Sequence, residues 1–161
     1  MKIAKSEDQA VRLVVRLARH GGRMTVAELA DSERLTEPTA AKLLGRLRRG
    51  GVVRAVRGCR GGYVLARPPE EIAVGEILAA VGDRLLRGGA CTPARPSDRD
   101  CPHLADCGLR PVWQYVEREL ARLLAAMSLA DLLRSEREVR AELAGRAPLV
   151  PFPLGEGVVE S

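Results

Sequence analysis

Aliphatic side chains recur at helical spacing through the first third of the sequence, and paired glycines divide them into short segments. The first segment follows Ser6-Glu7-Asp8-Gln9, which has capping-box spacing with the hydroxyl at the cap, and it ends at Gly21-Gly22. A second capping box, Thr25-Val26-Ala27-Glu28, opens a short helix that runs through about Glu33. The expected buried face of the first helix is formed by Ala10, Leu13, Val14, Leu17 and Ala18.

A third helix follows directly. Thr36 is placed to cap it, and Pro38 falls in its first turn, where a missing amide hydrogen does no harm. Gly50-Gly51 ends this helix, whose buried stripe is expected to be Leu43, Leu44 and Leu47. Three short helices with a tight turn between the last two predict a helix-turn-helix.

The residues after the third helix predict a β-hairpin, or wing. Val52–Val56 is typical of a strand, residues 57–62 of a glycine-rich turn, and Tyr63–Leu65 of a return strand. Residues Ile72–Val81 predict another helix. Because aromatic residues make up only 2% of the chain, the core must be built from Leu, Val and Ala, which suits packed helices. The predicted fold class is mainly α with a small β wing.

The second half of the chain predicts a loop and a long helix. Residues 83–110 break the helical pattern and hold three of the four cysteines. Pro111 then starts a long helix, and Ser128-Leu129-Ala130-Asp131 has the spacing that starts a last short one. We expect a partner subunit to pack against the apolar side of the long helix, and packing of that side against its own chain is the alternative. Its apolar side carries Val112, Val116, Leu120, Leu123, Leu124 and Met127.

Charge is unevenly distributed along the chain. Residues 1–67 hold 15 Lys and Arg against 6 Asp and Glu, a net charge of +9, whereas residues 68–161 carry −4. This asymmetry points to a polyanion as the partner of the first half, although a solvated charged face is the plain alternative. The third helix is expected to expose Thr39, Lys42, Arg46 and Arg49 to a DNA major groove. Three wing arginines are expected to contact DNA as well, with small glycines around them allowing entry to a minor groove: Arg54, Arg57 and Arg60.

These patterns divide the chain into four segments. We expect a winged helix-turn-helix DNA-binding domain over residues 1–67 and a connecting helix with a cysteine-bearing loop over 68–110. A dimerisation helix and a short C-terminal helix then occupy 111–147, followed by a flexible tail over 148–161. No signal peptide or membrane span is recognisable, so a cytoplasmic protein with reduced cysteines is expected.

Three cysteines of the loop could hold a metal centre. The spacing of these residues includes no Cys-x-x-Cys pair, which argues against a zinc ribbon. Iron–sulfur clusters are held by cysteine sulfur, so a cluster on Cys91, Cys101 and Cys107 is the other candidate. Zinc bound with His103, or a redox disulfide, are the alternatives. Three thiolates leave one cluster position open, and the candidates are His103, His20, Asp8, Glu7 or an exogenous ligand. Cys59 stands apart in the wing. Neither histidine lies in a nucleophile–base motif, so an enzyme is not expected.

The sequence resembles the Rrf2 family of bacterial transcription regulators, which includes IscR-like and NsrR-like members. The resemblance runs from about Met1 to about Leu143. It rests on 47–53 (LRRGGVV), 56–58 (VRG) with 61–66 (GGYVLA), 73–77 (AVGEI), 107–113 (CGLRPVW) and 128–132 (SLADL).

The resemblance implies a homodimer joined through the long helix and bound to a partly palindromic double-stranded operator. It also implies a [2Fe–2S] or [4Fe–4S] cluster, with 4Fe–4S favoured, on Cys91, Cys101 and Cys107. IscR-like members place a histidine ligand where this chain has Arg110, whereas some NsrR-like members use an N-terminal aspartate of the other subunit, which matches Asp8. We therefore expect a repressor, and we expect an iron–sulfur cluster to control its binding to DNA. A thiol or zinc switch without a cluster is the alternative.

Overall fold

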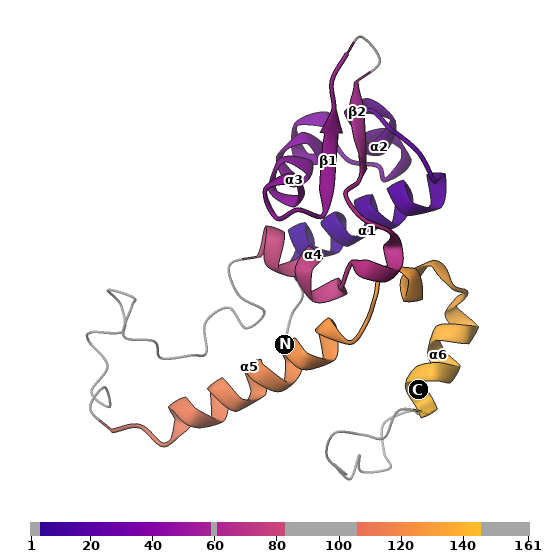
Figure 1. Ribbon diagram of the computed structural model, residues 1–161. Helices are drawn as coiled ribbons and strands as arrows, with labels where there is room; N and C mark the ends of the chain where they lie inside the picture. The colour runs from indigo at the N-terminus through magenta and orange to yellow at the C-terminus, as the bar shows by residue number, and fades with distance from the viewer. Residues whose placement is uncertain (1–3, 59–60, 83–105, 146–161) are drawn as a thin grey trace, which may run out of the picture.

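The computed structural model describes residues 4–58, 61–82 and 106–145. Three helices open the fold: α1 (Lys5–His20), α2 (Val26–Ser32) and α3 (Glu37–Arg49). In Figure 1 α2 and α3 are seen on either side of the strands of a hairpin, with α1 below, and a short turn joins α2 to α3. The predicted helix-turn-helix is confirmed, and so is the first helix end, because Gly21 takes a left-handed conformation with φ of 69°.

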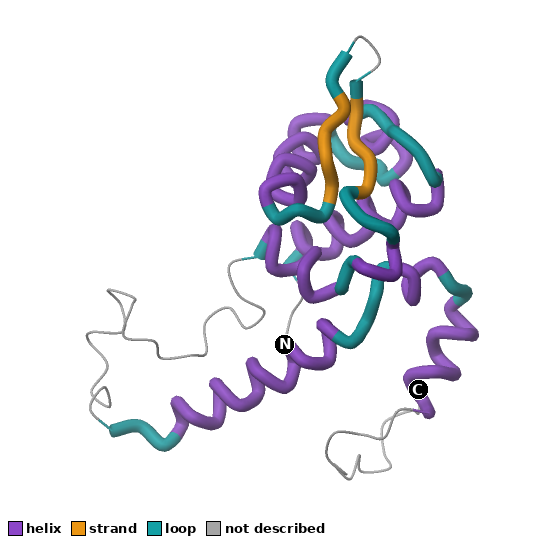
Figure 2. The backbone as a smooth tube through the Cα atoms, in the orientation of Figure 1, coloured by secondary structure: helices purple, strands orange, loops and turns teal. Residues whose placement is uncertain are grey.

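A two-stranded antiparallel sheet forms the wing. Strands β1 (Val53–Val56) and β2 (Gly62–Leu65) pair so that Val53 lies opposite Leu65 and Val56 opposite Gly62. The hairpin projects beyond the helices in Figure 2. An isolated bridge between Met24 and Tyr63 ties β2 to the connection between α1 and α2, so the wing is anchored at its base.

Helix α4 (Val74–Val81) closes the core from below, after a single 3₁₀ turn, η1 (Pro69–Glu71). It packs against α1 and α3. The hydrophobic core therefore continues past residue 67, and Leu129 from much later in the chain belongs to it. The fully buried aliphatic residues include Leu13, Val14, Leu29, Leu44, Leu47, Val52, Ile72 and Ile77. This core confirms the apolar stripe predicted for α3 and, except for the half-buried Ala18, the one predicted for α1.

Helix α5 (Leu109–Ala125) extends away from this core as an arm, as Figure 1 shows. The chain then returns to the core, where Val74 N donates to Met127 O at 2.8 Å and Leu129 N donates to Ile72 O at 2.7 Å. A second 3₁₀ turn, η3 (Ala130–Leu133), and helix α6 (Glu136–Gly145) complete the described chain. None of the described helices is both long and apolar enough to cross a membrane.

Four predicted helix starts are wrong. Helix α4 begins at Val74, two residues after Ile72. Helix α1 is capped at Ala4, whose backbone N–H donates to the Glu7 carboxylate at 2.8 Å, so Ser6 lies inside the helix. Helix α5 begins at Leu109, two residues before Pro111. The Ser128–Asp131 pattern does form its cap, but it opens only η3, and α6 begins separately after a Ser135–Glu138 capping box that the sequence interpretation missed.

Candidate nucleic-acid interface

The outer face of α3 is basic beyond its first turn, where Glu37 is exposed. Its inner face is buried through Ala40, Leu43, Leu44 and Leu47. On the outer side Pro38, Ala41, Lys42, Arg48 and Arg49 are exposed. A helix with one face fixed in the core and an exposed basic face has the shape and charge that fit a major groove.

Two of the four predicted α3 residues are less exposed than expected. Thr39 is half-buried, and its hydroxyl lies 2.8 Å from that of Thr36. Arg46 is also half-buried, and its Nη1 donates to the carbonyl oxygen of Val81, at the end of α4, at 2.8 Å. Arg46 is therefore less exposed than the sequence predicted, and its contact with DNA stays a prediction. Its partner lies 35 residues later in the sequence, so spacing along α3 gave no sign of it.

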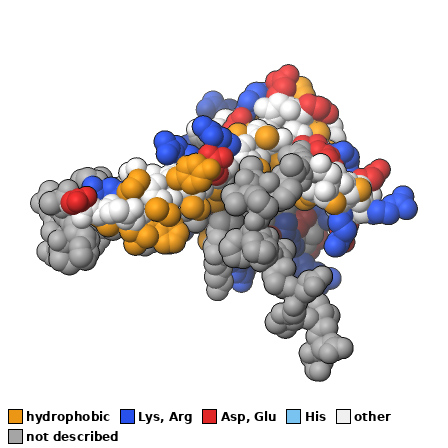
Figure 3. All heavy atoms as spheres, turned by 90° about the horizontal axis from the view of Figure 1, so that it is seen from below, with side chains coloured by type: hydrophobic (Ala, Val, Ile, Leu, Met, Phe, Trp, Pro, Cys, Tyr) orange, Lys and Arg blue, Asp and Glu red, His pale blue; other side chains and the backbone are white. Residues whose placement is uncertain are grey.

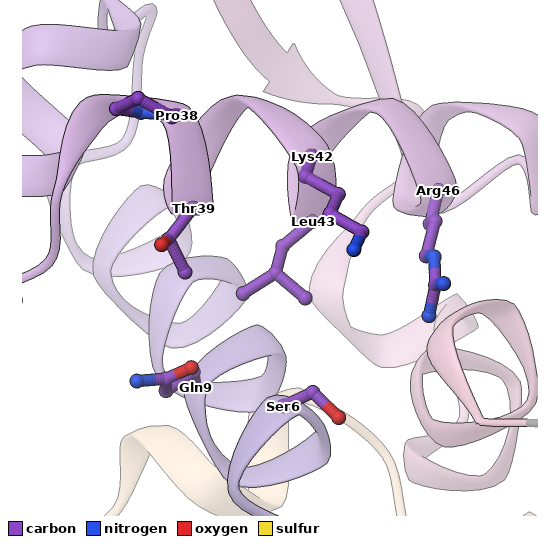
Figure 4. A pocket seen from close by; sticks show the side chains of 7 residues that line it. All are labelled: Ser6, Gln9, Pro38, Thr39, Lys42, Leu43 and Arg46. Atoms are coloured by element: carbon purple, nitrogen blue, oxygen red, sulfur yellow. The ribbon is translucent and has the colours of Figure 1, made fainter.

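A hollow of about 490 Å³ lies between α3 and the first turns of α1. Figure 4 shows Thr39 and Lys42 pointing from α3 toward α1, where Ser6 and Gln9 lie, whereas Arg46 points toward the end of α4. Sequence reasoning assigned neither α1 residue to this surface. Their i, i+3 spacing places them on one helix face, which was the available signal.

The wing presents basic side chains on a thin support. Arg54 and Arg57 are exposed, and Gly58 follows with φ of 124°, a conformation that favours glycine. Arg60 and Cys59 lie outside the described residues. Gly62 serves a different purpose from the one expected, because a Cβ there would lie 2.5 Å from the carbonyl oxygen of Met24. Because Gly62 has no side chain, the wing can pack closely against the α1–α2 connection at Met24.

The cysteine loop is described only at its end. Cys91, Cys101 and His103 lie outside the described residues, whereas Cys107 is a half-buried free thiol just before α5. No group of three or more potential metal ligands occurs among the described residues. Figure 1 shows the start of α5 at the end of the arm, away from the winged domain.

The candidate fourth ligands on α1 occupy very different positions. Asp8 is exposed in the first turn, and its carboxylate lies 3.9 Å from Arg12. Glu7 is only 7% exposed. His20 lies in the last turn, roughly 18 Å from Asp8 along the axis at about 1.5 Å per residue. His20 and Asp8 of one helix therefore cannot serve the same site.

An uncovered apolar face runs along α5. Val112, Val116 and Leu123 are 51%, 39% and 37% exposed. No described residue of α5 is buried, and Figure 3 shows hydrophobic side chains gathered along the arm. Single apolar residues on a surface are ordinary, but a continuous apolar face of this kind is typical of an interaction surface.

The helix-turn-helix, its anchored wing and the basic outer face of α3 define a winged-helix DNA-binding regulator. Comparison with known proteins agrees. The model of the Rrf2 family, described as an iron-dependent transcriptional regulator, matches residues 3–135. The chain belongs to the Rrf2 family of transcriptional regulators.

Individual relatives extend over nearly the whole chain. An HTH-type transcriptional regulator of Synechocystis sp., slr0846, is 33% identical over 144 residues, covering 88% of this chain and 93% of that protein. The solved structure of T. potens IscR is 28% identical, with a TM-score of 0.63 and 92% and 93% of the two chains covered. The B. subtilis CymR structure, at 23% identity and a TM-score of 0.62 over 83% and 96% of the two chains, shares the fold. The relatives are regulators, which confirms that the chain is not an enzyme.

Proposed function

We propose that this regulator reads a partly palindromic operator with α3 in the major groove and the wing in the adjacent minor groove. The observation that carries the proposal is the outer face of α3, which is basic, exposed and backed by a fully buried apolar stripe. Lys42 and Arg49 contact DNA from α3, together with Thr39 near its start. Arg54, Arg57 and Arg60 contact it from the wing.

Two copies of the chain bind together through α5. The apolar face of this helix is the support for the homodimer, since an isolated arm with this much exposed apolar surface gains stability when a second copy covers it. A two-fold dimer presents two α3 helices to half-sites about one helical turn apart, roughly 34–36 Å. That geometry explains why a partly palindromic operator is expected.

An iron–sulfur cluster controls DNA binding in this proposal. Cys91, Cys101 and Cys107 hold the cluster, and Asp8 of the partner subunit supplies the fourth ligand. The free, half-buried Cys107 thiol and the exposed Asp8 carboxylate suit these roles, because a soft thiolate and an accessible oxygen are both possible iron ligands. A [4Fe–4S] cluster is favoured, and its reaction with nitric oxide or oxygen, or its loss, supplies the signal. We infer a cytoplasmic repressor.

An absorption spectrum tests the cluster directly. Protein purified without oxygen is expected to show visible charge-transfer bands, and replacing Cys91, Cys101 or Cys107 with alanine should abolish them. Cys59→Ala is the matched control and should leave the spectrum unchanged. A colourless protein that contains one zinc per chain would indicate a zinc switch in place of the cluster. A colourless protein that contains no metal would indicate a thiol switch.

A further inference from the structure

The C-terminal end of α4 contacts the recognition helix at two points. The Arg46 guanidinium donates to Val81 O at 2.8 Å, and a Cβ on Gly50 would lie 2.6 Å from the Cβ of Ala80. Backbone carbonyls at a helix end lack partners within the helix, and a cation is favoured there by the helix dipole. Arg46 therefore fastens α3 to the end of α4, and Gly50 allows the two helices to touch.

The first turn of α1 meets the same end of α4. Glu7 is the single buried charged residue in the described part of the chain, and one of its oxygens accepts from Ala4 N at 2.8 Å. Its other oxygen would lie 2.5 Å from a Cβ on Gly82. The neighbour of Glu7 in the sequence is Asp8, the proposed fourth ligand. The end of α4 thus adjoins both the recognition helix and the helix turn that carries Asp8.

Gly82 is also the last residue before the chain enters the cysteine-bearing loop. We propose that Arg46 is a positioning residue, through which the end of α4, where the cysteine-bearing loop begins in the sequence, sets the orientation of α3 and so the affinity for DNA. We call the contacts of Arg46 and Gly50 with residues 80–82 the α3–α4 junction. This inference rests on the proposed function, because it assigns a route for regulation of the same DNA-binding surface.

The coupling is reciprocal, so it can be measured from the DNA side without any cluster. DNA bound to α3 must stabilise the end of α4, where Gly82 N donates to Leu78 O at 2.8 Å. The experiment is hydrogen–deuterium exchange of the full-length protein, free and saturated with a duplex that the wild-type protein selects from a random library. In the wild type, DNA should slow exchange in residues 78–82 about fivefold or more.

Four variants separate positioning from plain DNA contact. Arg46→Ala and Gly50→Ala should bind the duplex at higher protein concentration, yet lose the DNA-dependent slowing at residues 78–82. Arg46→Lys keeps a donor for Val81 O and should retain most of it. Arg49→Ala, an exposed arginine of the same helix, should weaken binding but keep the slowing once the protein is saturated. Retention of the slowing in either Arg46→Ala or Gly50→Ala, or its absence from the wild type, overturns the proposal. A wild-type protein that selects no duplex overturns the proposed function itself, and this inference with it.

Discussion

Arg57 is the described arginine nearest the tip of the wing, and it is exposed. Arg57→Ala is expected to weaken operator binding by about 1–3 kcal/mol, because a wing arginine in a groove reads base edges or groove shape. The measurement is a gel-shift titration. Arg137→Ala, which removes an exposed arginine of α6, is the control and should leave the affinity unchanged. Wild-type affinity in Arg57→Ala would remove the wing from the interface.

Asp8 is the residue that most directly tests the proposed ligand set. Asp8→Ala should still form a cluster, but its visible absorbance should decay faster in air, since the iron loses its protein oxygen ligand and becomes more accessible. His20→Ala, at the far end of the same helix, is the control. Equal cluster yield and equal decay in Asp8→Ala and the wild type would exclude the aspartate.

Single residues were predicted correctly where periodicity decides their environment and wrongly where a distant partner does. Leu43, Leu44 and Leu47 are buried, as their spacing on α3 predicts. Arg46 lies on the edge of that pattern, and its hydrogen bond to Val81 O cannot be inferred from local sequence. The burial of Glu7 was not predicted either, because charged residues are usually exposed.

At the scale of the element, α5 gives a clean test of dimerisation. Val112 is 51% exposed in the single chain, so Val112→Glu should leave each subunit folded. In the proposed interface the same charge would be buried without a partner. The dissociation constant of the dimer should therefore rise about 100-fold or more. Sedimentation at micromolar concentration measures the change.

The matched control adds the same charge to the opposite side of α5. Gln114 lines a hollow with Glu117, Arg118 and Ala121, away from the apolar face. Gln114→Glu should therefore remain a dimer. A wild-type protein that sediments as a monomer, or a Val112→Glu variant that dimerises as the wild type does, contradicts the interface.

The η3 turn fastens the chain after α5 to the core, and its cap predicts a pH dependence. Hydrogen bonds from the Ser128 backbone N–H and hydroxyl, together with Arg134, lower the pKa of the Asp131 carboxyl. Because the folded-state pKa lies below the unfolded value, Asp131 stabilises the fold at neutral pH. This contribution disappears as the pH falls through the folded-state pKa.

Asp131→Ala should consequently lose about 1 kcal/mol of unfolding free energy at neutral pH, the usual size of a capping interaction. The difference from the wild type should shrink as the solution is acidified. Urea unfolding across a pH series measures it, with Asp31→Ala on the exposed side of α2 as the control. A loss that stays constant with pH would show that the carboxylate charge does not contribute.

Elements were predicted better than their ends. Helices α1 to α4 and both strands follow from apolar spacing, capping residues and glycines. The start of α1 was misplaced because Glu7, rather than Ser6, supplies the cap contact to Ala4. The start of the last helix, α6, was misplaced because its Ser135–Glu138 cap follows a similar one at Ser128–Asp131, and the sequence interpretation assigned one helix to both.

At the scale of the whole molecule, a basic winged domain is followed by α5, a helical arm with an apolar face, and Cys107 lies just before the first residue of α5. The sequence predicted the winged fold and the long helix because each has its own residue pattern. The closure of a metal site depends on residues that are far apart in the sequence and, in our proposal, on a second subunit. The cluster ligands Cys91 and Cys101 therefore stay predictions.

The dependence of operator affinity on the cluster is the central claim. We would measure the Kd for the selected duplex with anaerobic, coloured protein and with the same protein after chelation has removed its visible absorbance. The account predicts that the two values differ by about fivefold or more, and that Cys107→Ala behaves as the cluster-free form. Equal Kd values for the coloured and colourless protein would contradict control of DNA binding by a cluster.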